Sequence, residues 1–235
     1  MKQFNFGGLL MSIICMLFIY SCDSSVDKKA PDIETESKEP FKAKSNQVLI
    51  IQHKVKKFTD WLALYEAHDS IRQAFGLHNY ILGRAMKDTN IVIVILKMED
   101  ATKAKELMTS ADLKSRMQNG GVIGVPSFHY LEVIFNDTIP IAQTARLMIT
   151  HQVKDWNEWK KSYDDHKAAR AGAGLLDRGL AYSVDDAHFV GIILAVTDFK
   201  KATEFQNSPE LKARMQQAGV DGIPTFLYYN VVKKY

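Results

Sequence analysis

The chain has 235 residues, of which 46% are hydrophobic and 24% are charged. These proportions are typical of a folded globular protein and exclude a polytopic membrane protein, a disordered chain and a fibrous protein. Lysine and arginine number 30 against 27 acidic residues, so the net charge is only +3. Because the basic residues are scattered, we expect no nucleic-acid partner.

The first 21 residues have the pattern of an export signal. Lys2 precedes an uncharged apolar run at 7–20. A helix over that run would measure roughly 21 Å, which is short of the bilayer core of about 30 Å. We therefore expect a signal peptide at residues 1–21 and not a membrane span.

The apolar run ends in Ile19-Tyr20-Ser21-Cys22, where a small residue precedes a cysteine. This ending resembles the lipobox of bacterial lipoproteins, although Tyr20 departs from the small residue usual at its position. The resemblance implies that Cys22 is acylated and becomes the mature N-terminus. The protein would then be lipid-anchored in the bacterial cell envelope, at the periplasmic face or in the outer membrane. A plain signal peptide that is cut nearby is the alternative.

Residues 22–45 are rich in Asp, Glu, Lys, Ser and Pro and poor in apolar residues. Such a segment cannot bury enough surface to offset the entropy lost on ordering, so we expect a disordered tether. The only cysteines of the chain are Cys15 and Cys22. The folded part therefore has no disulfide, no thiolate metal site and no cysteine nucleophile.

The rest of the chain is a tandem duplication. Each residue n aligns with residue n + 98 without a gap, and identities such as Trp61 with Trp159 run along the whole alignment. The period is too long for a solenoid unit and there are two copies only. We expect one α/β repeat at residues 46–135 and a second at residues 144–233, with a short link between them.

Each repeat reads as strand, helix, strand, strand, helix, strand. In the first repeat the pattern predicts a strand at 48–55, one helix at 58–75, hairpin strands at 80–86 and 90–98, a helix at 100–108 and a last strand at 127–135. This βαββαβ order is that of the ferredoxin-like fold, so the predicted fold class is α+β.

The central strands indicate how the two repeats combine. Residues 91–96 and 189–196 are apolar on both strand faces, which is typical of a sheet covered on both sides. The helices of a repeat can cover only one face, so the other repeat must cover the second. We expect an intramolecular dimeric α/β barrel, that is, a monomer with an internal pseudo-dimer.

Three segments resemble the dimeric α/β-barrel superfamily, which includes antibiotic-biosynthesis-monooxygenase-like domains. They are HQVKDWNEWKKSYDDHKAAR, DDAHFVGIILAVTDFKKATEF and SPELKARMQQAGVDGIP. The superfamily includes cofactor-independent monooxygenases, haem-degrading enzymes and members without known activity. The resemblance implies a ligand pocket between sheet and helices, but the fold does not choose among the reactions.

The candidate site residues gather on one face of the first helix of each repeat and on the first strand. Burying a histidine or arginine there requires a partner, water or a ligand. By the resemblance we expect ligand-binding residues at His53, Trp61, Tyr65, His68, Arg72, Trp159, Tyr163 and Arg170, and candidate catalytic residues at His151 and His166. The alternative is that the aromatic residues are core, the arginines extend to water and the histidines are satisfied by the backbone. Tyr130 and Tyr228 are expected in the barrel core.

The two copies differ on the candidate helix face. Leu64, Ile71 and Phe75 of the first repeat are replaced by small residues in the second, namely Ser162, Ala169 and Ala173. This loss of volume predicts that the main ligand pocket, and the larger cavity, lie in the second repeat.

No carboxylate recurs on the candidate face and no glycine-rich loop follows a strand, so paired-acid hydrolysis and nucleotide cofactors are not expected. We expect no metal site and no resident cofactor, with haem as one conceivable ligand. The sequence thus predicts a pocket for a small, partly apolar compound, aromatic or haem-like. The protein could be a monooxygenase-like enzyme with a histidine as proton acceptor, or a non-catalytic module that binds a ligand or a partner.

Overall fold

The computed structural model describes residues 46–235. The first repeat comprises β1 (Gln47–Val55), α1 (Phe58–Ala67), α2 (Asp69–Ala74), β2 (Leu77–Ala85), β3 (Ile91–Met98), α3 (Ala101–Thr109), α4 (Ala111–Asn119) and β4 (Val122–Asn136). The second comprises β5 (Ala145–Val153), α5 (Trp156–Asp165), α6 (Lys167–Gly172), β6 (Leu175–Ser183), β7 (Phe189–Val196), α7 (Phe199–Gln206), α8 (Pro209–Gln217) and β8 (Val220–Lys234).

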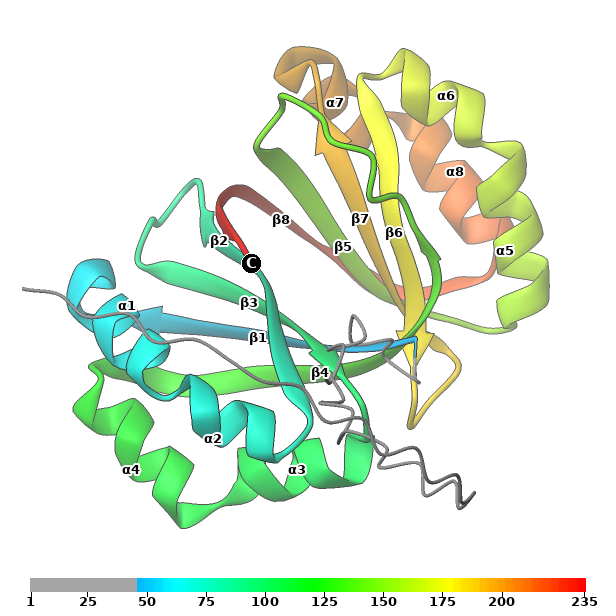
Figure 1. Ribbon diagram of the computed structural model, residues 1–235. Coiled ribbons are helices and arrows are strands. Elements are labelled where there is room, and N and C mark those ends of the chain that lie inside the picture. The colour runs from blue at the N-terminus through cyan, green and yellow to red at the C-terminus, as the bar shows by residue number, and fades with distance from the viewer. Residues whose placement is uncertain (1–45) are drawn as a thin grey trace, which may run out of the picture. The chain divides into compact units, whose positions relative to one another are not determined.

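The eight strands close into one antiparallel barrel. Their order around it is β1-β3-β2-β8-β5-β7-β6-β4, so β2 pairs with β8 and β4 pairs with β6 across the two repeats. Helices α1–α4 cover the outer face of β1–β4, and α5–α8 cover that of β5–β8 (Figure 1). The predicted α+β class, the ferredoxin-like repeats and the barrel within one chain are confirmed.

The two apolar faces of the central strands have separate functions in packing. Val92, Val94 and Leu96 of β3 join the core beneath the helices, whereas Ile93 and Ile95 point into the barrel. Side chains alternate along a strand, so a strand that is covered on both sides must be apolar at every position. The continuous apolar runs in the sequence follow from this double burial.

The single helix predicted at 58–75 is wrong. The helix ends at Ala67, and a second helix starts at Asp69, with His68 between them at φ −97° and ψ 18°. His166 makes the same junction between α5 and α6. The polar face of the sequence continues through the break, which is why periodicity alone did not reveal it.

The last strand of each repeat begins earlier than predicted. β4 starts at Val122 and includes Gly124, which has φ +74°, and the register between β1 and β4 shifts where His53 stands. β8 has the same irregularity opposite His151. Bulges of this kind interrupt the ladder and re-aim side chains, and they are common beside functional sites.

Tyr130 and Tyr228 do not lie inside the barrel, contrary to expectation. They pack against the cores under the helices, and the next residue along each strand, Leu131 or Tyr229, points into the barrel. The expectation missed by one residue, and one residue is enough to change the face of a strand.

The predictions of a signal peptide, of a modified Cys22 and of a disordered tether concern residues 1–45, which lie outside the described part of the chain. Among the helices of residues 46–235, none is both long enough and apolar enough to cross a membrane.

Candidate functional site

Each repeat holds a column of stacked side chains between sheet and helices. In the second repeat the ring of His151 lies 5.4 Å from that of Trp159, and the Trp159 ring lies 5.1 Å from that of Tyr163. The guanidinium carbon of Arg170 sits 3.6 Å from the centre of the Tyr163 ring. A buried cation over an aromatic face is stabilised by the ring quadrupole.

The first repeat has the same column, built from His53, Trp61, Tyr65 and Arg72. The corresponding distances are 5.3 Å, 4.8 Å and 3.8 Å. Trp61 and Trp159 are 5% and 3% exposed, so both tryptophans are core residues. The structure therefore brings the predicted residues together, and it gives Trp, Tyr and Arg a packing function in both repeats.

The charge of Arg170 is balanced by a residue that the sequence analysis missed. Asp177 on β6 accepts hydrogen bonds from Nε and Nη2 of Arg170, each at 2.9 Å, and a third from the Tyr163 hydroxyl, also at 2.9 Å. The ion pair is nearly buried, with side-chain exposures of 7% and 11%. Two parallel bonds of this kind are strong and fix the orientation of both groups.

In the first repeat a different set of residues balances the charge of the equivalent arginine, Arg72. Asn79 replaces the aspartate, accepts from the Tyr65 hydroxyl and donates to Asp69. Arg72 then pairs with Asp69 at 3.1 Å, within its own helix. This position is asparagine in the first repeat and aspartate in the second. A comparison that looks only for residues identical in both repeats therefore could not find Asp177 as the partner of Arg170.

The hydroxyls of Tyr65 and Tyr163 stay protonated at neutral pH. Burial raises the pKa of both hydroxyls far above the usual value, and the neighbouring arginines offset only part of the effect. Their hydroxyls act as hydrogen-bond donors that hold the column in place.

His151 is one of the buried polar groups that the fold leaves without a hydrogen-bond partner in residues 46–235. It is 5% exposed, and neither ring nitrogen makes a hydrogen bond in the described chain. Burial lowers its pKa to about 4, so the ring is neutral at pH 7 and offers one N–H donor and one lone pair. His53 is buried in the same way, with its pKa lowered to about 4. Buried polar atoms of this kind are normally satisfied by water or a ligand.

The second histidine distinguishes the repeats. His68 lies 3.1 Å from an Nη1 of Arg116 and is only partly buried. His166 is 7% exposed, and its Nε2 makes no hydrogen bond, although the Glu210 carboxylate stands 3.6 Å away. The pocket of the second repeat therefore contains two histidines with unsatisfied ring nitrogens.

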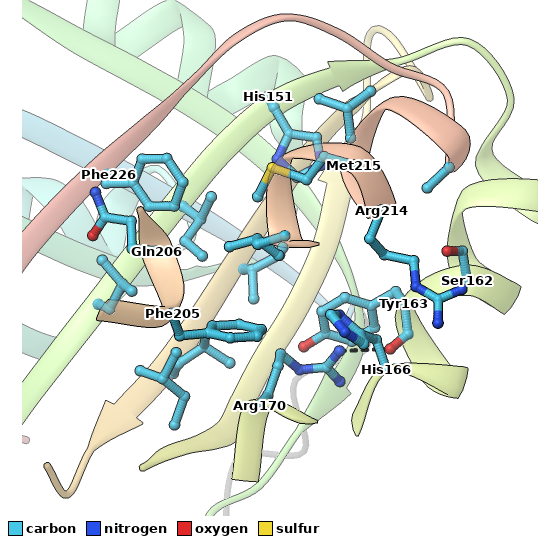
Figure 2. A pocket seen from close by; sticks show the side chains of 18 of the residues that line it. His151, Ser162, Tyr163, His166, Arg170, Phe205, Gln206, Arg214, Met215 and Phe226 are labelled. Carbon is cyan, nitrogen blue, oxygen red and sulfur yellow. Dashed lines mark hydrogen bonds between the residues drawn. The ribbon is translucent and has the colours of Figure 1, made fainter. Parts of the chain in front are cut away.

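Figure 2 shows this pocket. His151 lies beside Met215, and His166 lies well away from it, near Tyr163, Arg170 and Arg214. The two histidines line one cavity, as expected, but they do not meet. A ligand that engages both would have to extend along the pocket.

The prediction of a larger cavity in the second repeat is wrong. The cavity between sheet and helices measures about 70 Å³ in each repeat. Phe205 explains the equality, because it stands where the first repeat has Leu107 and its ring lies 5.6 Å from His166. The added ring fills the volume that the smaller helix residues give up.

This volume also bears on haem and on metals. A cavity of about 150 Å³ encloses benzene, so 70 Å³ holds several water molecules but not a macrocycle. Haem does not fit the pocket as it stands, and we derive no step through it. No group of three or more His, Cys, Asp or Glu side chains among residues 46–235 is placed to hold a metal ion.

No family model and no curated protein matches the chain. Solved structures do. An anthrone oxidase-like protein matches with TM-score 0.53 and 12% identity, over 83% of this chain and 95% of its own. Candidate monooxygenases match with TM-scores of 0.51 (Lactobacillus acidophilus, 10% identity, 80% of this chain and 94% of that) and 0.50 (Fusobacterium nucleatum, 13% identity, 81% and 94%).

The chain has the dimeric α/β-barrel fold. The matched share exceeds either half of the chain, so the likeness includes both repeats of the barrel. At this level of identity it establishes the fold of the dimeric α/β barrel, and the chemistry has to be argued from the pocket.

Proposed function

We propose that this dimeric α/β-barrel protein binds a small, partly apolar compound in the helix–sheet pocket of its second repeat. The observation that supports the proposal is the pair of ring nitrogens of His151, which are buried and unsatisfied in an otherwise apolar cavity. A ligand hydroxyl, which is both donor and acceptor, could donate to the unprotonated nitrogen or accept from the N–H of the other. Phenols and enols offer this combination on an apolar body.

Ligand entry requires a side chain to move. Met215 and Phe205 line the pocket, and methionine is the more easily rearranged because its unbranched chain has several low-energy conformers. If the Met215 side chain changes conformation, the pocket can therefore accommodate a single aromatic ring. Larger aromatic or haem-like compounds would require α8 to shift as well.

The proposal predicts that a phenol stabilises the protein through the second repeat only. Catechol, phenol and haem are added to the full chain, and the midpoint of thermal unfolding is followed. We expect His151→Ala to remove most of the shift given by the best of the three compounds, and His166→Ala to reduce it. His53→Ala, the matched variant of the first repeat, should leave the shift intact.

An unchanged shift in the His151→Ala/His166→Ala double variant would reject this site. So would a shift that disappears in His53→Ala, because the ligand would then occupy the first repeat. Failure of every phenol and of haem to shift the wild-type midpoint would reject the ligand class.

A second candidate function is oxygenase chemistry without an organic cofactor. His166 favours it, because its buried Nε2 makes no hydrogen bond in the described chain and is placed to accept a proton from a substrate in the pocket. His151, whose pKa is about 4, is a weak base and suits the binding of the substrate. In such a reaction dioxygen is the oxidant: a CH2 carbon of the substrate loses two hydrogens and gains one oxygen to become a carbonyl, and the other oxygen leaves as water with those two hydrogens. The test of this oxygenase function is oxygen uptake with anthrone as substrate. We expect the wild type to consume oxygen and His166→Ala to lose this activity.

We also propose that the chain is a lipoprotein of the bacterial cell envelope. The support is the sequence around Cys22, which a diacylglyceryl group would modify. Cells expressing the full chain are labelled with a radioactive fatty acid, and the wild-type protein should take up label and fractionate with membranes. Cys22→Ser should lose both properties, whereas Cys15→Ser, the matched control, should keep them. Label on Cys22→Ser would contradict the proposal.

A further inference from the structure

A third cavity lies inside the barrel, on the opposite side of the sheet from both histidine pockets. It measures about 230 Å³, more than three times the volume of either helix–sheet cavity. Its walls are aliphatic and polar side chains of both repeats, and its outer rim includes the exposed residues Phe135 and Tyr235. Natural cores seldom leave so large a space unfilled.

Two glycines of the second repeat create this space. Gly179 and Gly191 line the cavity at positions where the first repeat has Ile81 and Ile93. A Cβ atom added to Gly179 would meet its nearest neighbour, Ile193, at an ordinary 3.6 Å. Room for a side chain therefore exists at Gly179, whereas a Cβ atom at Gly191 would meet the Leu131 side chain at a tight 3.2 Å.

A buried arginine faces the same cavity. Arg146 on β5 is 4% exposed and lines the space, whereas the first repeat has Val48 at the equivalent position. Its Nη1 donates to the carbonyl oxygens of Gln143 and Ala145, at 2.8 Å and 2.9 Å. Within residues 46–235, Nε and Nη2 make no hydrogen bond, and no carboxylate pairs with the guanidinium.

Arg170 shows how the Nε–Nη2 edge of an arginine in this protein binds a carboxylate. Arg170 uses Nε and Nη2 to hold both oxygens of Asp177. At Arg146 the corresponding edge has no carboxylate, so an anion from outside the fold can take the place that Asp177 takes in the other pair.

The other charges at the cavity do not neutralise Arg146. Arg178 is paired with Asp137 at 2.7 Å, and Lys234 at the rim adds another positive charge. Burial lowers the pKa of Arg146, Tyr229 opposes the effect in part, and the positive charge of Arg178 adds to it. A buried guanidinium without a counter-ion costs stability, and an anionic ligand would recover it.

Tyr229 supplies a neutral donor beside this cation. It is directly opposite Arg146 in the register of β5 and β8, and it is 1% exposed. In the described chain its hydroxyl makes no hydrogen bond, although it lines the cavity. Together the two residues form a polar group in a lining that also includes aliphatic side chains such as Ile50, Ile81 and Leu131.

We propose that the barrel cavity is a second binding site, for a small apolar monocarboxylate. The guanidinium edge of Arg146 holds the two carboxylate oxygens, the Tyr229 hydroxyl donates to one of them, and the apolar body fills the space opened by Gly179 and Gly191. Scaled from the cavity of about 150 Å³ that encloses benzene, 230 Å³ accommodates roughly nine heavy atoms. Benzoate has this size and shape.

The test uses the full chain and titration calorimetry. Sodium benzoate should bind the wild type, and benzamide, which has the same shape without the charge, should bind about tenfold more weakly or worse. Arg146→Met should lose at least about tenfold in benzoate affinity and leave benzamide affinity unchanged. Val48 shows that an apolar side chain is accommodated at this position, so we expect the variant to fold.

A second variant tests the cavity itself. Gly179→Ile copies Ile81 of the first repeat and should abolish the binding of both compounds. His151→Ala, in the helix–sheet pocket, should bind benzoate as the wild type does, which separates this site from that of the proposed function. The proposal is overturned if benzoate does not bind the wild type, if benzamide or inorganic phosphate binds as tightly, or if benzoate affinity survives either Arg146→Met or Gly179→Ile.

Discussion

Acidification from pH 8 to pH 5 should lower the free energy of unfolding by about 4 kcal/mol through His53 and His151 alone. In the unfolded chain each histidine takes up a proton near pH 6.5, whereas in the folded protein the pKa of each is about 4. Between these values the unfolded state binds more protons, so stability falls as the pH falls. Each histidine contributes about 2 kcal/mol at pH 5.

Urea unfolding at a series of pH values measures this effect. His53→Phe and His151→Phe should each remove about half of the pH dependence, and the double variant should remove most of it. The pKa of His129 is also lowered by burial, so a smaller slope should remain. A double variant with the wild-type slope would show that the two histidines are not buried as neutral rings. The slope is the readout because the absolute stability also changes with the new side chain.

Replacing Asp177 by asparagine should destabilise the protein by about 3–5 kcal/mol, since it leaves the buried Arg170 without a counter-charge. The second repeat has no substitute acid, because Lys167 stands where the first repeat has Asp69. The matched variant Asp69→Asn should cost less than about 1 kcal/mol, because the Asp69 side chain is 36% exposed.

The repeats also provide a rescue for this variant. Lys167→Asp in the Asp177→Asn background recreates the arrangement of the first repeat, in which asparagine is on the strand and aspartate is on the helix. We expect it to restore a measurable part of the lost stability in urea unfolding, below about 1 kcal/mol, as for the exposed Asp69 of the first repeat. Equal losses from Asp177→Asn and Asp69→Asn, or no recovery in the double variant, would contradict the assignment of Asp177 as the partner of Arg170.

Much of the fold could be predicted from the sequence because the duplication doubles every signal. The apolar runs at 91–96 and 189–196 demanded cover on both faces, and two copies of one sheet supply it. The break in the first helix could not be predicted in this way. His68 and His166 interrupt the helix while leaving the same face buried, so the spacing of apolar residues carries no trace of the junction.

The sequence predicted which residues line the candidate pocket, but it did not predict the polar partners of those residues. Stacked Trp, Tyr and Arg side chains recur in both repeats because both need the same packing between helix and sheet. Their partners, Asp177 in one repeat and Asn79 with Asp69 in the other, do not recur. The barrel cavity likewise depends on positions at which the two repeats differ, namely Gly179, Gly191 and Arg146. A comparison of the strands of the two repeats, residue by residue, would have pointed to these positions.

The pairing of β2 with β8 has a consequence for biosynthesis. Leu82 in the first repeat is a register neighbour of Lys233 in the second. During translation the edge of β2 therefore stays without its neighbour until β8 has been made. Exposed strand edges invite pairing with other chains, and contacts so distant in sequence form slowly. We therefore expect the nascent first repeat to be prone to pairing with other chains until the second repeat is complete.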